Sequence, residues 1–248
     1  MEIIPKKIHY FWFGHNQKPE IVQKCIESWN KYMPDYEVIE WNEDNYNIHK
    51  CKYMRQAYEN KKWAFVSDYA RFDILYQYGG IYLDTDVELL KPIPVEILQS
   101  GNAVTGMEST GRVAPGLIFA TWPRHRFCKA MLDSYERDEF IVEGEQNLLT
   151  VNKRVCNILD NEGFSSNNQM QTIMHIDIYP SEYFCGYNLD LREYEITDKT
   201  VSIHHYASTW KKKGIKRRLQ TIIKNTIGNK GYRAILQIKR KLFGVYDK

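Results

Sequence analysis

Residues 79–86 read Gly79-Gly80-Ile81-Tyr82-Leu83-Asp84-Thr85-Asp86, and this stretch decides the fold class. Residues 81–84 predict a short strand, and the double glycine ends a helix predicted over residues 62–78. That helix is indicated by apolar side chains that recur every three or four residues: Trp63, Phe65, Val66, Tyr69, Phe72, Leu75 and Tyr76. We therefore expect a helix that leads directly into a strand, with polar residues where the strand ends.

The same alternation of strand and helix extends toward the N-terminus. The aromatic-rich run 7–13 predicts a buried strand that Gly14 ends, and residues 19–32 predict a helix with Pro19 in its first turn. A second strand is expected over 36–41. Strands that alternate with helices indicate an α/β fold with a mainly parallel sheet. No repeat or linker interrupts the chain before residue 210, so residues 1–210 are expected to form one domain.

Two carboxylates follow the predicted strand. Because residues two apart in extended backbone share a face, Tyr82, Asp84 and Asp86 are expected to line one surface. Neighbouring carboxylates repel unless a cation lies between them, and oxygen ligands suit Mg²⁺ or Mn²⁺. Such an ion would neutralise a diphosphate leaving group. The alternative interpretation is a solvated surface turn without a metal.

The helix before the double glycine carries Ser67, Asp68 and Arg71. Asp68 and Arg71 are three residues apart and therefore lie on one face of the helix. A carboxylate and a guanidinium together bind sugar hydroxyls well, since one accepts and the other donates hydrogen bonds. A purely local ion pair is the alternative interpretation.

These motifs resemble a known family. The segments 4–14, Ser28-Trp29, 34–36, Ala64-x-x-Ser67-Asp68-x-x-Arg71 and 79–86 look like the retaining glycosyltransferases of family 32. That family includes bacterial capsule and lipopolysaccharide sugar transferases and mannosyltransferases. The core is also similar to the glucosyltransferase domains of large clostridial toxins. The resemblance covers most of residues 1–92 and recurs at 201–210.

The resemblance implies a GT-A (Rossmann-like) nucleotide-sugar-binding fold, a nucleoside-diphosphate sugar donor, most simply UDP-linked, and Mn²⁺ or Mg²⁺. By position, Trp12 would stack on the base, and packing in the core is its alternative role. Asp84 and Asp86 would bind the metal. The residues expected to contact the donor or act in catalysis are Ser67, Asp68, Arg71, Tyr82, Asp84 and Asp86.

A second patch completes the resemblance at Val201-Ser-Ile-His204-His205-Tyr-Ala-Ser208-Thr-Trp210. By position in the family, His205 is expected as the third metal ligand, and Ser208 and Trp210 are expected to approach the diphosphate. His204 would then point inward or make a supporting hydrogen bond. One departure concerns 143–150, where relatives carry a Thr-Gly-Pro segment on the acceptor side. Glu145, Gln146 and Asn147 either contact a sugar there or begin a solvated helix.

The net charge of +3 conceals two oppositely charged regions. Residues 211–248 carry thirteen Lys and Arg against Asp247 alone, or +12, and residues 1–210 are therefore at −9. The apolar residues of this tail fall on helical stripes, which predicts basic amphipathic C-terminal helices on an anionic membrane surface. Ordinary packing against the body is the alternative, and nucleic-acid binding is disfavoured because few aromatic residues lie among the basic ones.

Together these features predict a metal-dependent, retaining hexosyltransferase of surface or capsule polysaccharide biosynthesis. Its acceptor would be a saccharide or a lipid-linked saccharide. The N-terminus lacks a secretory signal pattern, and the five scattered cysteines suit reduced thiols, so we expect a cytoplasmic protein that is peripheral on the inner face of the membrane. A phosphatase fits poorly, because Glu88 stands where that motif needs Thr or Val. An inactive sugar-binding or interaction module is the remaining alternative.

Overall fold

The computed structural model describes residues 2–207 and, beyond them, only residues 226, 228, 231, 234, 235 and 238. The elements in chain order are β1 (Lys7–Phe11), α1 (Glu20–Tyr32), β2 (Glu37–Trp41), α2 (Lys52–Glu59), α3 (Trp63–Tyr78), β3 (Gly80–Tyr82), β4 (Val87–Leu89), α4 (Val95–Leu98), β5 (Ala103–Gly106), β6 (Phe119–Thr121), α5 (Arg126–Asp133), β7 (Ile141–Val142), β8 (Glu145–Gln146), α6 (Val151–Asp160), β9 (Gln171–Ile173), β10 (Ile176–Tyr179), α7 (Ser181–Phe184), β11 (Tyr187–Asn188), β12 (Glu193–Tyr194) and β13 (Ser202–His204).

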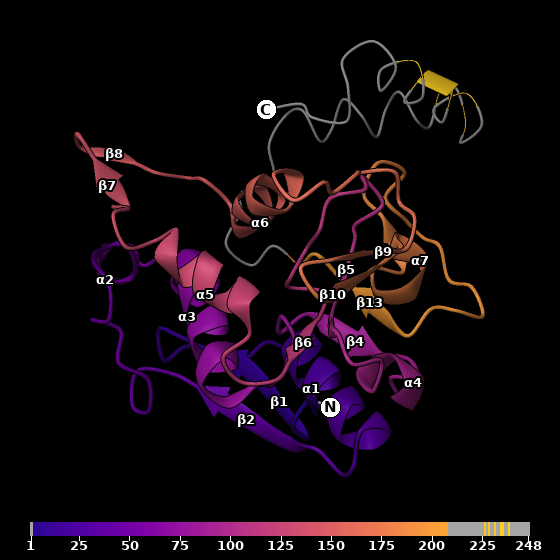
Figure 1. The fold of residues 1–248 in the computed structure, drawn as a ribbon, viewed down its shortest axis with the longest axis horizontal. Helices are drawn as coiled ribbons and strands as arrows, with labels where there is room; N and C mark the ends of the chain where they lie inside the picture. The colour runs from indigo at the N-terminus through magenta and orange to yellow at the C-terminus, as the bar shows by residue number, and fades with distance from the viewer. Residues whose placement is uncertain are drawn as a thin grey trace.

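A seven-stranded sheet in the order β2-β1-β3-β6-β5-β10-β9 forms the centre of the fold (Figure 1). Strand β1 runs parallel to β2 and β3, and β5 runs parallel to β10. Strands β6 and β9 run antiparallel to their neighbours. The predicted α/β, Rossmann-like organisation is confirmed, with its parallel pairs divided between the two halves of the sheet.

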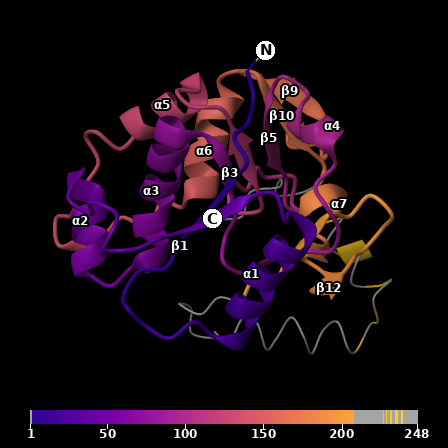
Figure 2. The same cartoon turned by 90° about the horizontal axis from the view of Figure 1, so that it is seen from below.

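Apolar side chains pack on both faces of this sheet. One buried cluster joins Phe11 of β1 to α3, α5 and α6, and the other joins Ile8 of the same strand to α1, β4 and α4. Figure 2 shows α3 and α5 on the opposite side of the sheet from α1. The side chains of β1 therefore contribute alternately to the two clusters, because successive side chains of a strand point to opposite faces of the sheet.

The double glycine ends α3 as predicted. Gly79 caps the helix with φ of 63° and Gly80 has φ of 99°, a backbone region that other residues rarely adopt. A Cβ atom on Gly80 would also lie 2.8 Å from the carbonyl oxygen of Lys7. Glycine at these positions lets β3 begin directly after the helix and pair with β1. This tight connection fixes where the residues after β3 emerge.

A two-stranded ribbon, β4 with β13, lies outside the main sheet. Its antiparallel register pairs His204 with Val87 and Ser202 with Leu89. Fully buried Trp29 of α1 donates a hydrogen bond from Nε1 to the Val87 carbonyl oxygen at 2.8 Å, which holds the ribbon against the helix. The ribbon therefore places residues next to one another that are about 115 positions apart in the sequence.

The predicted division at residue 210 and the basic helices of 211–248 lie outside the described residues, apart from the six isolated positions above. Among the described residues, no helix has the length and apolar character that crossing a membrane requires. All five cysteines are free thiols in the structure.

Candidate active site

Three residues of α3 and one of β3 form a compact group that we call the Arg71 cluster: Ser67, Asp68, Arg71 and Tyr82. The Arg71 side chain is only 4% exposed, and its Nη2 lies 2.7 Å from Asp68 Oδ1. Its Nε donates to the Ser67 carbonyl oxygen at 3.1 Å, and its guanidinium lies 4.6 Å from the centre of the Tyr82 ring. The expectation that Asp68 and Arg71 lie together is met, but the pair is buried rather than on the surface.

Burial and the neighbouring charges set the protonation of the Arg71 cluster. Burial raises the pKa of Asp68 to about 6, although Arg71 opposes this shift. The backbone N–H of Val151, at the start of α6, also bonds to the Asp68 carboxylate. Burial raises the pKa of the Tyr82 hydroxyl as well. The cluster therefore combines the Arg71 guanidinium, which stays charged, with the Asp68 carboxyl group, whose pKa is raised toward neutral pH.

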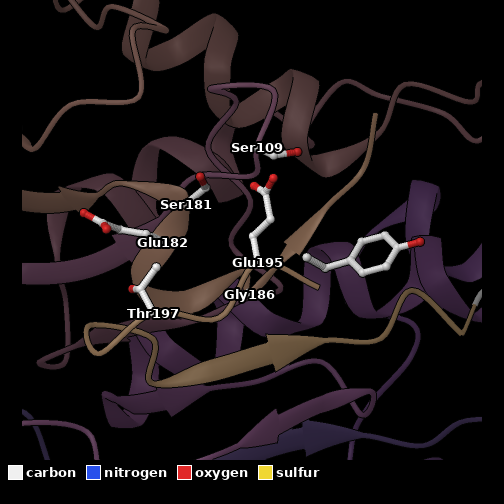
Figure 3. Close-up of a pocket in the computed structure, with 7 residues that line it drawn as sticks. Ser109, Ser181, Glu182, Gly186, Glu195 and Thr197 are labelled. Carbon is white, nitrogen blue, oxygen red and sulfur yellow. The ribbon is translucent and has the colours of Figure 1, made fainter. Parts of the chain in front are cut away.

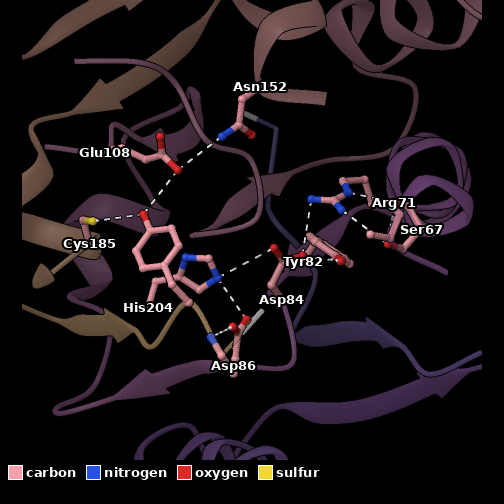
Figure 4. Close-up of polar contacts among 12 residues, drawn as sticks. Ser67, Arg71, Tyr82, Asp84, Asp86, Glu108, Asn152, Cys185 and His204 are labelled. Carbon is pink, nitrogen blue, oxygen red and sulfur yellow. Dashed lines mark hydrogen bonds and ion pairs between the residues drawn. The ribbon is translucent and has the colours of Figure 1, made fainter. Parts of the chain in front are cut away.

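Asp84 connects the Arg71 cluster to a second group. Its Oδ1 accepts a hydrogen bond from the Tyr82 hydroxyl at 2.7 Å and lies 3.3 Å from Arg71 Nη1. Its Oδ2 faces His204, with Nε2 at 3.9 Å. Figure 4 shows Asp84 between Arg71 and His204. One carboxylate thus serves both groups.

The second group is the carboxylate–histidine cluster: Asp84, Asp86 and His204. One ligand atom from each lies within 4.8 Å of the other two. His204 Nε2 is 2.9 Å from Asp86 Oδ1, and Asp86 Oδ2 accepts a hydrogen bond from the Ala207 backbone N–H. Although burial opposes it, the contact with His204 lowers the pKa of Asp86 to about 2. Burial lowers the pKa of His204, but Asp86 and Asp84 outweigh that effect and raise it.

The donor set of this cluster suits a divalent cation. Two carboxylate oxygens and an imidazole nitrogen are ligands that Mn²⁺ accepts readily, and they already converge on one point. His204 Nδ1 is buried without a partner, which marks incomplete bonding in the site. Asp84, Asp86 and His204 are therefore the residues that would hold the metal.

His205 requires a correction, because the structure does not place it in the cluster. Its Nε2 lies 2.8 Å from Glu88 Oε2, and its Nδ1 lies 3.1 Å from the Tyr194 hydroxyl, so both ring nitrogens have partners. The reason is the pairing of β13 with β4, which puts His204 beside the strand that follows Asp86. His204, the predicted supporting histidine, takes the place that the motif spacing gave to His205.

The other predicted site residues are less closely associated. Trp12 is half-buried against the α1 side of the sheet, and its Nε1 donates to the Asn16 carbonyl oxygen at 2.6 Å. Next to this loop is a hollow of about 450 Å³ lined by Gly14, His15, Asn16, Tyr58, Glu59, Lys61 and Trp63. Ser208 and Trp210 lie outside the described residues. Glu145 and Gln146 form β8 in a projecting hairpin, and α6 begins later, at Val151.

Sequence reasoning missed a glycine behind Asp84. The Asp84 backbone N–H donates to the Gly116 carbonyl oxygen at 2.9 Å, and a Cβ atom on Gly116 would lie 2.0 Å from Asp84 Oδ2. No side chain fits there while Asp84 keeps this position. The only sequence signal was a glycine shortly before β6, which is too common a feature to be informative.

A smaller cavity of about 90 Å³ lies beside α7 and the β11–β12 hairpin (Figure 3). Its lining residues are Ser109, Ser181, Glu182, Gly186, Tyr187, Glu195 and Thr197. None of the carboxylate–histidine cluster lines it. The convergent charged groups, rather than this cavity, define the candidate active site.

An acidic pair suited to a cation, next to a buried arginine and just beyond the carboxyl end of β3, is the kind of site that binds phosphorylated sugars. Residues 19–106 match the family model described as the glycosyltransferase sugar-binding region containing DXD motif. The match confirms the family resemblance predicted from the motifs over this segment of the chain.

Several characterised proteins are similar to the chain over part of its length. Inositol phosphoceramide mannosyltransferase 1 of Schizosaccharomyces pombe is 29% identical over 138 residues, which is 51% of this chain and 41% of that protein. The human alpha-1,4-N-acetylglucosaminyltransferase is 28% identical over 154 residues, which is 60% of this chain and 42% of that protein. The matches thus span less than half the length of these relatives.

Two solved structures are similar to part of the chain. The PaToxG glycosyltransferase aligns with a TM-score of 0.47 at 20% identity, over 64% of this chain and 70% of that one. A glycosyltransferase involved in the glycosylation of the major capsid of PBCV-1 aligns with a TM-score of 0.48 at 12% identity, over 88% and 98% of the two chains.

Proposed function

We propose that the chain is a metal-dependent, retaining glycosyltransferase that moves a hexose from a nucleoside-diphosphate sugar, most simply UDP-linked, to a saccharide or lipid-linked acceptor. The observation that carries this proposal is the shared Asp84. It joins a cluster suited to a cation and a diphosphate to a cluster suited to sugar hydroxyls. In a nucleoside-diphosphate sugar, the diphosphate and the sugar are likewise adjacent.

Each cluster has a separate task in this proposal. Asp84, Asp86 and His204 would hold Mn²⁺ or Mg²⁺, which would act as a Lewis acid and neutralise the charge of the diphosphate. Arg71 donates hydrogen bonds to the transferred sugar, and Asp68 accepts them. The rigid packing of Arg71 on Tyr82 and Ser67 keeps these groups oriented before the donor arrives, which lowers the cost of ordering them.

The nucleotide base is assigned to the hollow beside Trp12. The hollow is large enough for a base, and aromatic Tyr58 and Trp63 line it. Trp12 does not line the hollow itself, but its Nε1 bonds to the carbonyl oxygen of Asn16, which does. Because Trp12 packs on the α1 side of the sheet, stacking of its ring on the base stays a prediction.

For the chemical step we propose front-face attack with retention of configuration. The bond from the anomeric carbon to the diphosphate breaks, the acceptor oxygen bonds to the same face, and its proton passes to the leaving diphosphate. No side-chain carboxylate is assigned as a nucleophile. Lys211 or Lys212 would stabilise the departing phosphate, and both lie outside the described residues. A stable glycosyl-enzyme adduct found by chemical trapping would contradict this scheme.

The cellular setting remains the one that the sequence predicted. We propose synthesis of a surface or capsule polysaccharide at the inner face of the cell membrane, with the basic segment 211–248 on anionic lipid. Flotation of the full chain and of a chain ending at residue 210 with anionic and neutral vesicles tests the location. Equal flotation of the shortened chain would contradict it.

A donor screen tests the proposed function. Purified protein with Mn²⁺ is incubated with UDP-linked and GDP-linked hexoses, and release of the nucleotide and the mass of the product are measured. Asp86→Asn should lower turnover at least about 100-fold, since the cluster loses a metal ligand. Glu88→Gln is the matched control, two residues further along the chain and paired with Lys24 and His205 instead. Turnover that survives Asp86→Asn would contradict the site, and an inactive wild type would favour a sugar-binding module.

A further inference from the structure

The carboxylate of Glu108 lies beyond the end of β5, at the same edge of the sheet as Asp84, and no motif pointed to it. Its Oε1 accepts hydrogen bonds from the Tyr206 hydroxyl at 3.2 Å and from Asn152 Nδ2 at 3.3 Å. Three segments far apart in the sequence therefore meet at this carboxylate: the β5 loop, the start of α6 and the loop after β13. Figure 4 shows these contacts.

Glu108 and Asn152 are linked through their neighbours to both clusters of the candidate site. The Tyr206 ring lies 4.0 Å from the His204 ring, which links Glu108 to the carboxylate–histidine cluster. On the other side, Val151, next to Asn152, bonds to Asp68 through its backbone N–H. In Figure 4, Glu108 lies on the side of His204 away from Arg71, and Asn152 lies between Glu108 and Arg71. Glu108 and Asn152 thus form a wall of the site that runs from the β5 loop to the start of α6.

The chemistry of this wall suits a neutral, hydroxyl-bearing ligand. Glu108 is not one of the three residues that converge on the cation position, and an additional carboxylate beside a diphosphate would repel it. A carboxylate can accept about four hydrogen bonds, so those from Tyr206, Asn152 and Thr110 leave capacity for a ligand hydroxyl. The Asn152 amide supplies both a donor and an acceptor next to it.

Resting on the function proposed above, we propose that Glu108 and Asn152 form the acceptor side of the active site. The Glu108 carboxylate accepts a hydrogen bond from an acceptor hydroxyl next to the one that attacks, and so orients the attacking hydroxyl toward the anomeric carbon while its own proton stays free to pass to the leaving diphosphate. Both residues lie beyond the family-matched segment 19–106. A shared donor machinery would thus be combined with an acceptor wall from another part of the chain.

Glu108→Gln tests this assignment, because it removes the charge and retains an oxygen that accepts from Tyr206 and Asn152. We expect the dissociation constants of Mn²⁺ and of UDP, measured by calorimetry, to change less than about threefold. Transfer from the donor found in the screen to a panel of methyl glycosides should fall at least about 30-fold in kcat/KM. Asn152→Ala should act in the same direction, with a smaller loss.

Tyr206→Phe is the matched control, since it removes one hydrogen bond to Glu108 and keeps the ring against His204. It should lower transfer less than Glu108→Gln does. If Glu108→Gln weakens Mn²⁺ binding as strongly as transfer, Glu108 only braces His204 and the assignment is wrong. Unchanged transfer would also overturn it. A wild-type chain that binds Mn²⁺ and UDP but uses no donor would overturn the proposed function itself and the acceptor assignment with it, an outcome seen before any variant is compared.

Discussion

The Arg71 cluster and the carboxylate–histidine cluster share Asp84 but are built in different ways. All four residues of the Arg71 cluster come from positions 67–82, and Arg71 and Asp68 are almost fully buried with their charges paired. The carboxylate–histidine cluster combines Asp84 and Asp86 with a histidine 118 residues after Asp86, and its carboxylates are 29% and 19% exposed. The first cluster is complete without a ligand, whereas the second is suited to a cation that offsets its charge.

This difference predicts that substitutions in the Arg71 cluster lower stability in addition to weakening donor binding, whereas substitutions in the carboxylate–histidine cluster affect ligand binding with little change in stability. The four tests below separate these two outcomes, from the largest expected effect to the smallest.

Arg71→Leu should destabilise the fold by about 3 kcal/mol, or about 150-fold in the folding equilibrium, because it leaves the buried Asp68 carboxylate unpaired. Arg71→Lys should cost less, since it keeps the charge and loses the fork geometry. Denaturant unfolding measures both. The control is Arg55→Leu, which removes an exposed ion pair with Glu59 and should change stability little. An Arg71→Leu protein as stable as the wild type would show that the cluster does not support the fold.

His204→Asn should weaken Mn²⁺ binding about 30-fold and leave the melting temperature close to that of the wild type. His205→Asn is its matched neighbour, and it should change Mn²⁺ affinity less than about threefold, because His205 bonds to Glu88 and Tyr194. Calorimetric titration of Mn²⁺ into each protein is the measurement. The reverse order of effects would restore the ligand assignment that the motif spacing gave.

Gly116→Ala tests the residue between the two clusters. The added methyl group would lie 2.0 Å from Asp84 Oδ2, so the Asp84 carboxylate has to move. We expect Mn²⁺ affinity to fall about 10-fold, as for residues that orient metal ligands. Gly163→Ala is the control, since no atom lies within 4 Å of that position, although its φ of 89° makes the substitution strained. It should lower stability without changing Mn²⁺ affinity.

The final test concerns His9, which contacts the end of the helix that carries the Arg71 cluster. Fully buried His9 has Nε2 2.9 Å from the Gly79 carbonyl oxygen and accepts at Nδ1 from Trp41. Burial lowers its pKa from 6.5 to about 4. The unfolded chain therefore binds a proton at a pH where the folded chain does not, and stability is lost as pH falls from about 6.5 toward 4.

Between pH 7 and pH 6 the contribution of His9 to the unfolding free energy should fall by about 0.7 kcal/mol. Urea unfolding of the wild type and of His9→Gln at both values isolates this term, and His49→Gln at an exposed position is the control. An identical pH slope in the wild type and in His9→Gln would show that His9 is not held neutral by the fold.

Much of the Arg71 cluster could be predicted from the sequence because its contacts are local. Asp68 and Arg71 are one helical turn apart, and the double glycine fixes the short path to Tyr82 and Asp84. The strands and helices predicted before residue 84 follow periodicity and glycine or proline signals, and the structure changes their ends by one or two residues. The helix α2 (Lys52–Glu59) was not predicted. Their degree of burial was not predictable, since it depends on α5 and α6 covering α3.

The α/β alternation, the acidic strand end and the family resemblance of residues 19–106 could all be predicted without the structure. These features are encoded in residues that are near one another in the chain, where helix and strand geometry alone fix the neighbours. The tertiary structure decided that His204 rather than His205 meets Asp86, and that Gly116 and Glu108 lie beside the site. Each of those contacts depends on strand pairing or packing between distant segments, and a shift of one residue in the register of β13 would turn the other histidine inward.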